Sequence, residues 1–402
     1  RLAIVGPLPP ARTGIATYNA RLAERMTDHC ELDYFAEHEA GSPRGEPAPY
    51  RRFSAGAFAR RLNPASYDAV FYTFGNSANH HQAYQLAMWY PGIAWFHDVQ
   101  IAELYLSFGR SRMNEDATRE HMRSALLHQY GERAPEYVVD GDNWKSDYAY
   151  ELAGVRLCTE VVAKARAVVV TSELARSALT LDAGPYNLVP RTWVVPLAVS
   201  PPAHAIDPGC RDPGTGSSPP VIVTLGTVAP VKQPEVLLAA MAAVNLHAPA
   251  RLTFVGHVED QYRDKLCHLA AELGITHQIT FTGFVKRREE LGALLAPASG
   301  AVQLRMGNSG AASTGIADAL AHGLAVLTNA SAAAELPSGT VQLVGADVTA
   351  GSLALDIRRL LDDADHRDRL GSAALDYASS HTLDDAVEAM LEVARWHRGG
   401  QA

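Results

Sequence analysis

Short runs of uninterrupted apolar residues alternate with helical stretches along nearly the whole chain. In the first half they include Leu2-Ala3-Ile4-Val5, Ile93-Ala94-Trp95-Phe96 and Val168-Val169-Val170, and in the second half Val221-Ile222-Val223, Leu252-Thr253-Phe254-Val255 and Leu324-Ala325-Val326-Leu327. A strand that is covered on both faces is apolar throughout, whereas a strand with one solvated face alternates. The pattern therefore predicts parallel sheets covered by helices on both faces, which is a doubly wound α/β architecture.

Two such sheets are expected, because the chain is long and is interrupted near its middle. It has 402 residues, more than one core usually serves, and Ser200–Pro220 contains six prolines, three glycines and three serines in 21 positions. We predict an N-terminal domain over residues 1–199, a linker over 200–220, a second domain over 221–380, and a terminal helix within 381–402 that docks on the first domain. The two Rossmann-like domains are expected to face each other across a cleft.

Composition excludes several classes of function. With 35 basic and 44 acidic residues the formal charge is −9, which offers no basic face to a nucleic acid. The four cysteines are far apart and form no CxxC pair, so we expect reduced thiols and a cytoplasmic location. No apolar run is long enough to span a membrane.

In open parallel sheets, ligands bind beyond the carboxyl ends of the strands, so the residues after each apolar run are candidates for chemistry. In the second half, one such loop runs from Gly226 and Thr227 to Lys232, just before a helix that opens with Pro234. A lysine at this place can neutralise a diphosphate that the free N–H groups of the helix also face. The alternative is a solvated loop lysine, and the seven residues from Gly226 to Lys232, taken alone, favour it.

A second candidate segment follows the strand that ends at Arg305. A Gly/Ser turn containing Ser309 leads to Ser313 or Thr314, either of which can cap a helix that ends before Gly323. Asp318, about one turn into this helix, could accept hydrogen bonds from two ribose hydroxyls, or it could be an ordinary surface aspartate. Arg305 could add positive charge or form an ion pair at the strand end.

The first half offers weaker candidates. His97-Asp98 follows a strand directly, so His97 could donate to a sugar hydroxyl or a phosphate, or it could be a satisfied half-buried imidazole with Asp98 as a cap. Gly14-Ile15 begins a helix and could approach a phosphate, but there is no GxGxxG, which argues against a nicotinamide dehydrogenase.

Metal ligands are not expected. Asp140-Gly141-Asp142 is a D-x-D sequence in a polar stretch without a third ligand nearby, and we interpret it as a loop. The pairs His80-His81 and His121 with His128 lack ligand spacing on one helix, and we interpret them as surface residues.

The order of these motifs resembles that of family 4 glycosyltransferases. The residues that carry the resemblance are Gly14-Ile15, His97-Asp98, Ser172-Glu173, Val195-Pro196-Leu197, Gly226 to Lys232, Thr282-Gly283-Phe284-Val285, Leu304-Arg305, Ala319 to Val326 and Ala334-Glu335-Leu336-Pro337. The resemblance implies a GT-B fold in which the second domain holds a nucleotide-diphosphate sugar and the first holds the acceptor. It also implies transfer with retention of the anomeric configuration, without a metal or other cofactor.

The resemblance assigns roles to individual residues. Lys232 would face the donor diphosphate, and Gly14-Ile15 would pack against it from the other domain. His97 would touch the transferred sugar. Asp318 would replace the ribose-binding glutamate of an E-x7-E motif. The remaining expected donor-site residues are Gly226, Thr227, Val285, Ser309, Ser313 and Thr314, with Arg305 as a further catalytic candidate.

Two departures from the family pattern bear on substrate and activity. Thr227 stands where many members have an arginine, and Gly310-Ala311 stands near the position of the first glutamate, which would hold hexose hydroxyls. We therefore expect an unusual donor sugar, such as a deoxy, amino or branched one, and a small soluble acceptor. The alternatives are a degenerate, non-catalytic binding protein and a GT-B-like sugar-nucleotide epimerase.

Overall fold

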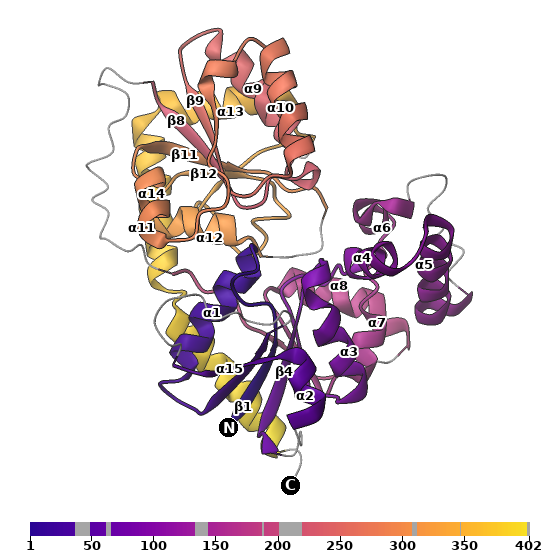
Figure 1. The fold of residues 1–402 in the computed structure, drawn as a ribbon. Helices are drawn as coiled ribbons and strands as arrows, with labels where there is room; N and C mark the ends of the chain where they lie inside the picture. Colours follow the sequence, from indigo (N-terminus) through magenta and orange to yellow (C-terminus); the bar gives the residue numbers. More distant parts are fainter. Residues whose placement is uncertain are drawn as a thin grey trace. The chain divides into compact units, whose positions relative to one another are not determined.

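The computed structural model describes residues 1–36, 49–61, 66–132, 144–186, 189–200, 219–307, 312–345 and 347–399. Most of the predicted linker, the Asp140-Gly141-Asp142 loop, Ser309 and Gly310-Ala311 lie outside these ranges. The described residues form two compact units (Figure 1). The first contains those within Arg1–Pro196 together with Gly307, Ala312 and the terminal helix, and the second contains those within Leu197–Met306 and Ser313–Thr382.

The first unit is built on a seven-stranded parallel sheet in the order β3-β2-β1-β4-β5-β6-β7. Its strands are β1 (Leu2–Gly6), β2 (Leu32–Ala36), β3 (Arg51–Ser54), β4 (Ala69–Phe74), β5 (Ile93–Phe96), β6 (Ala167–Val170) and β7 (Thr192–Val194). Every residue of β1, β2, β4, β5 and β6 is buried, as expected for strands covered on both faces. The edge strand β3 is exposed or half-buried and was not predicted.

Helices cover both faces of this sheet. One apolar cluster joins the sheet to α2 (Ala55–Arg61), α3 (His81–Trp89), α7 (Thr159–Lys164) and α8 (Glu173–Ala183). The terminal helix α15 (Leu383–Gly399) packs beside α1 (Gly14–Met26), where Arg25 forms an ion pair with Asp384 at 2.6 Å (Figure 1). The long connection from β5 to β6 contains, besides α7, the helices α4 (Ala102–Arg112), α5 (Glu115–Tyr130) and α6 (Asp147–Leu152).

The second unit has a six-stranded parallel sheet in the order β10-β9-β8-β11-β12-β13. Its strands are β8 (Val221–Leu225), β9 (Arg251–Val255), β10 (Ile279–Phe281), β11 (Ala298–Gln303), β12 (Val326–Thr328) and β13 (Gln342–Leu343). One core packs α9 (Pro234–Asn245), α10 (Asp260–Glu272) and α13 (Ala350–Asp362) on the sheet. The other packs α11 (Arg288–Leu295), α12 (Thr314–Ala321) and α14 (Ala364–Ser379). The predicted pair of doubly wound parallel sheets is confirmed.

Among the described helices, none combines the length and the apolar character that crossing a bilayer requires.

Candidate functional site

The carboxyl edge of the second sheet is formed by tightly packed backbone. Gly226, directly after β8, has a φ of +89°, which favours glycine, and its N–H donates to the Val255 carbonyl at 2.9 Å. Gly256, after β9, lies so close that a Cβ on it would be 2.1 Å from the Gly226 carbonyl oxygen. The ends of β8 and β9 therefore admit no side chains at these two positions.

Lys232 is held over this edge by the loop that follows β8. A short 3-10 helix, Pro230–Lys232, turns the side chain back so that Nζ donates to the Leu225 carbonyl at 2.8 Å. A Cβ on Gly226 would come within 2.6 Å of that Nζ, so the glycine leaves room for the ammonium group. The loop is also tied to the end of β11, because the Met306 N–H donates to the Val231 carbonyl at 2.7 Å.

The electrostatic surroundings of Lys232 favour an anion. Burial, and then the nearby positive charge of Arg305, lower the pKa of Lys232 from its ordinary 10.5 to about 8. Its ammonium is still mostly protonated at pH 7, and within the described residues no carboxylate forms an ion pair with it. An anion placed here would gain the attraction of a partly desolvated cation.

The N-terminus of α12 reaches the same point. Ser313 caps the helix, because its Oγ accepts from the Ile316 N–H at 3.3 Å. Thr314 is the first helical residue, and a Cβ on Gly315 would lie 2.9 Å from the Leu225 carbonyl oxygen. The positive end of the α12 dipole and the Lys232 ammonium therefore meet at Leu225.

The other predicted residues of the second unit are more dispersed. The Arg305 N–H donates to the Asn329 Oδ1 at 2.6 Å, which fixes the chain where β11 ends. Thr227 is exposed beside Gly226, and Asp318 is half-buried in the middle of α12. Val285 packs, half-buried, against the core on the α12 side of the sheet.

In the first unit, His97 is buried at the carboxyl end of β5. Its Nε2 lies 3.1 Å from the Asn19 Oδ1, and the Asn19 Nδ2 donates to the Pro7 carbonyl at 3.3 Å, so we assign the proton of the ring to Nε2. The imidazole contacts Tyr18 and Trp95, with ring centroids 5.6 and 4.5 Å away. Burial, and to a smaller degree His80, lower the pKa of His97 to about 3, so the ring is neutral at physiological pH.

His80 is a second buried imidazole at this edge, and its interpretation as a surface residue was wrong. The side chain is 1% exposed, and its Nδ1 donates to the Thr73 carbonyl at 2.8 Å. Burial lowers the pKa of His80 to about 4. A Cβ on Gly75 would lie 2.6 Å from Ile15 Cδ1 and 2.8 Å from His80 Nε2, so these two side chains enclose the glycine that follows β4. The signal that could have identified His80 as a residue of this edge is its place in the loop that follows β4.

Of the other residues that the sequence singled out in this unit, His81 needs a correction, whereas Asp98 and Gly14 lie as the local sequence predicts. His81 is half-buried rather than on the surface, and its Nε2 donates to the Leu104 carbonyl at 3.0 Å. Asp98 acts as a cap, because its Oδ1 accepts from the Gln100 N–H at 3.0 Å. Gly14 opens α1, which is capped by the Thr13 hydroxyl accepting from the Ala16 N–H at 3.1 Å. In the described part of the chain, no three histidine, cysteine or acidic side chains are grouped as metal ligands would be.

Comparison with known proteins agrees with this architecture. Residues 211–376 match the family model described as glycosyl transferases group 1. A search of the curated proteins found no match. Among solved structures, sucrose-phosphate synthase from Thermosynechococcus elongatus is similar, with 15% identity, 98% of both chains covered and a TM-score of 0.67.

Two further structures show the same likeness. Anabaena Alr3699/HepE in complex with UDP-glucose is 14% identical, covers 98% of both chains and has a TM-score of 0.65. WaaG, a glycosyltransferase involved in lipopolysaccharide biosynthesis, is 14% identical, with 98% of this chain and 99% of that chain covered and a TM-score of 0.62. At these identities the likeness establishes the fold, two Rossmann-like domains as in GT-B proteins.

Proposed function

We propose that the protein is a glycosyltransferase that moves a sugar from a nucleoside-diphosphate donor to an acceptor hydroxyl. The observation that carries the proposal is the Lys232 ammonium, which has no carboxylate partner among the described residues and meets the start of α12 at Leu225. The residues that match the family model, 211–376, include Lys232, Leu225 and α12, and HepE has been solved in complex with UDP and with UDP-glucose. Both support a nucleotide sugar as the anion.

The chemistry follows from where charge develops. As the bond between the anomeric carbon and the diphosphate oxygen lengthens, the sugar becomes oxocarbenium-like and the diphosphate gains negative charge. Lys232, Arg305 and the N–H groups at the start of α12 are positive or dipolar groups fixed before the reaction starts, so they stabilise that charge without reorganising. We propose that they do so without a metal ion.

We further propose transfer with retention of configuration, as in the family that the sequence resembles. In a front-face displacement the leaving phosphate oxygen takes the proton of the acceptor hydroxyl, so a separate protein base is not required. Neutral His97 is suited to a sugar hydroxyl rather than to a phosphate, because it carries no charge and its Nδ1 presents a lone pair when Nε2 is engaged by Asn19.

We propose an unusual donor sugar, because Gly310-Ala311 replaces the expected hexose-binding glutamate, and a small soluble acceptor. We also propose a cytoplasmic location, supported by the free cysteines Cys30, Cys158 and Cys267 in the described part of the chain.

The test is calorimetric titration with UDP, GDP, dTDP and ADP, followed by the best ligand on two variants. We expect one diphosphate to bind, Lys232→Ala to abolish measurable binding, and Lys286→Ala, which removes an exposed lysine of the same unit, to bind like the wild type. Absence of binding by all four nucleotides, or unchanged binding by Lys232→Ala, contradicts the proposal.

A nucleotide-binding protein without transferase activity is the second candidate. It is favoured by Thr227, which is exposed where many family members have an arginine. Turnover of the donor sugar, lost in Lys232→Ala, would exclude it.

A further inference from the structure

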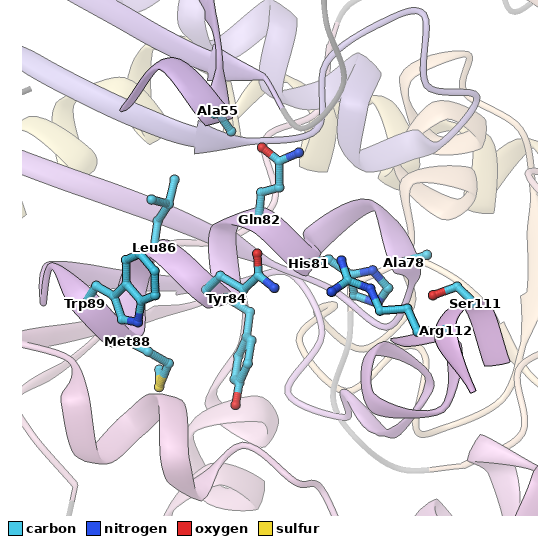
Figure 2. Close-up of a pocket in the computed structure, with 12 residues that line it drawn as sticks. Ala55, Ala78, His81, Gln82, Tyr84, Leu86, Met88, Trp89, Ser111 and Arg112 are labelled. Atoms are coloured by element: carbon cyan, nitrogen blue, oxygen red, sulfur yellow. The ribbon is translucent and has the colours of Figure 1, made fainter. Parts of the chain in front are cut away.

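The first unit contains a hollow that is lined by none of the residues to which the proposed chemistry assigns a role. It has a volume of about 660 Å³, within the range of small-molecule sites, and lies between α2, α3 and α4. Ala55 and Gly56 contribute from α2, and Ser111 and Arg112 from the end of α4, while α3 forms the floor (Figure 2). The beginning of α2 and the end of α4, which are far apart in the sequence, therefore line the hollow together with α3.

One end of the hollow is polar and positively charged. Figure 2 shows His81, Arg112 and Ser111 grouped there. His81 is fixed by its bond to the Leu104 carbonyl, which leaves Nδ1 as the unprotonated nitrogen of the neutral ring. The Arg112 guanidinium stacks on the Phe108 ring at 4.3 Å, and no described carboxylate forms an ion pair with it.

Arg112 is the one residue with a permanent charge among those that line the hollow in the described structure, and no acidic residue lines it. Glu160 lies behind the wall, where its Oε2 accepts from the Tyr84 hydroxyl at 2.7 Å and from the Tyr105 hydroxyl at 3.0 Å. The charge of the lining therefore favours an anionic ligand.

The other end is apolar. Leu86, Met88 and Trp89 gather there, with the Tyr84 ring between the two ends (Figure 2). Trp89 is 74% exposed although tryptophan is usually much more buried, so it presents a broad surface on which a ring or an alkyl chain can pack. A ligand that fits both ends is an anion with an aromatic or aliphatic body.

The polar end also adjoins the carboxyl edge of the first sheet. Ala78 and His81 line the hollow, and His80 between them is the buried imidazole at that edge. The polar end of the hollow therefore lies next to His80, whose charge in turn affects His97 at the same edge of the sheet. We propose that the hollow binds the acceptor and that the acceptor is a small anionic molecule with an apolar body; this rests on the proposed transferase function.

The test uses two glucosides that differ by one charge, 4-carboxyphenyl β-glucoside and phenyl β-glucoside, titrated calorimetrically into the full chain. We expect the carboxylate to bind about fivefold more tightly, because an ion pair with an exposed arginine contributes up to about this factor. Arg112→Gln should remove that preference, and Trp89→Ala should weaken both probes several-fold. Arg123→Gln, which removes an exposed arginine on α5, should behave like the wild type.

Equal affinity for the two probes, or a preference that survives Arg112→Gln, would overturn the proposal. Cosedimentation with phosphatidylglycerol vesicles that requires Arg112, without binding of either glucoside, would instead assign the surface to a membrane and would also overturn it. Nucleotide titration distinguishes failure of this proposal from failure of the transferase function. The variants should keep the wild-type nucleotide affinity. A chain that binds the glucosides through Arg112 but binds no nucleotide would refute the transferase function, and with it the acceptor role, while leaving the hollow as a site for anions.

Discussion

Replacing Lys232 by methionine should weaken nucleotide binding without weakening the fold. The lowering of its pKa from 10.5 to about 8 corresponds to roughly 3 kcal/mol against the charged form, at about 1.4 kcal/mol per pH unit. Because Lys232 is half-buried rather than enclosed, solvent screens part of its charge, and the cost of the charged form in the folded state is about 2 kcal/mol. Loss of its hydrogen bond to Leu225 costs about 1 kcal/mol. Lys232→Met is therefore expected to be about 1 kcal/mol more stable at pH 7.

The stability difference between Lys232→Met and the wild type depends on pH. Since the folded-state pKa lies below the unfolded value, the unfolded chain binds more protons between about pH 8 and 10.5, and this lysine makes the wild type more stable as pH rises through that interval. The advantage of Lys232→Met in urea unfolding should thus shrink from pH 7 to pH 9.5. At pH 8 about half of the lysine is neutral, so binding of a diphosphate should take up about half a proton, measurable by calorimetry in buffers of different ionisation enthalpy.

Nucleoside-diphosphate affinity of Lys232→Met should fall at least tenfold, as expected for a lost charge-assisted contact. Lys286→Met serves as the exposed control and should change neither quantity. If Lys232→Met instead loses 1 kcal/mol or more of stability at pH 7 and binds nucleotide normally, the lysine is structural and the reasoning is refuted.

Three further results are expected. Gly315→Ala places a Cβ 2.9 Å from a backbone oxygen and should weaken nucleotide binding several-fold. Gly351→Ala, in open space on α13, should instead keep the wild-type affinity and raise the unfolding free energy by about 0.5 to 1 kcal/mol. If the two variants have the same nucleotide affinity in calorimetry and the same stability in urea, this expectation is wrong. His80 has a folded-state pKa of about 4, so its stabilisation is present above pH 6.5 and is lost as pH falls toward 4; His80→Asn should show a shallower acid loss of stability, and parallel profiles would count against it. Asp318→Asn should reduce the preference for UDP over 2′,3′-dideoxy-UDP about tenfold, and an unchanged preference would remove Asp318 from the ribose site.

The two sheets could be predicted because strands buried on both faces have a distinctive composition. The elements that the apolar pattern did not predict are those to which burial on both faces of a sheet does not apply. Strand β3 reads Arg51-Arg52-Phe53-Ser54 and is an edge strand, partly exposed, so its residues carry no continuous apolar signal. Helices α4 to α7 replace a simple crossover between β5 and β6, and the alternation of strands and helices along the chain does not require a connection of that length.

The candidate sites differ in the same way. The placement of the Lys232 side chain is local, since β8, the turn at Gly226 and the 3-10 helix follow one another along the chain and bring the lysine back to Leu225. The start of α12 and Arg305, by contrast, are contributed by later parts of the chain. The environment of His80 depends on Gly75 and Ile15, and Ile15 is contributed by α1, some 65 positions earlier in the chain. Burial that depends on such distant partners cannot be predicted from the residues next to the histidine, although its place after β4 marks it as a candidate.

The same distinction bears on the proposed anion site, where the resemblance to family 4 glycosyltransferases places Thr227 at a position at which many of those enzymes have an arginine. The positive charge of Arg305 is close enough to lower the pKa of Lys232, and Arg305 follows β11, which is the neighbour of β8 in the sheet. Parallel strands bring their carboxyl ends to one edge, so a second cation can be supplied by an adjacent strand instead of the same loop. We infer that Arg305 supplies the charge that Thr227 lacks, and that the anion site depends on the combined field at this edge more than on any one loop motif.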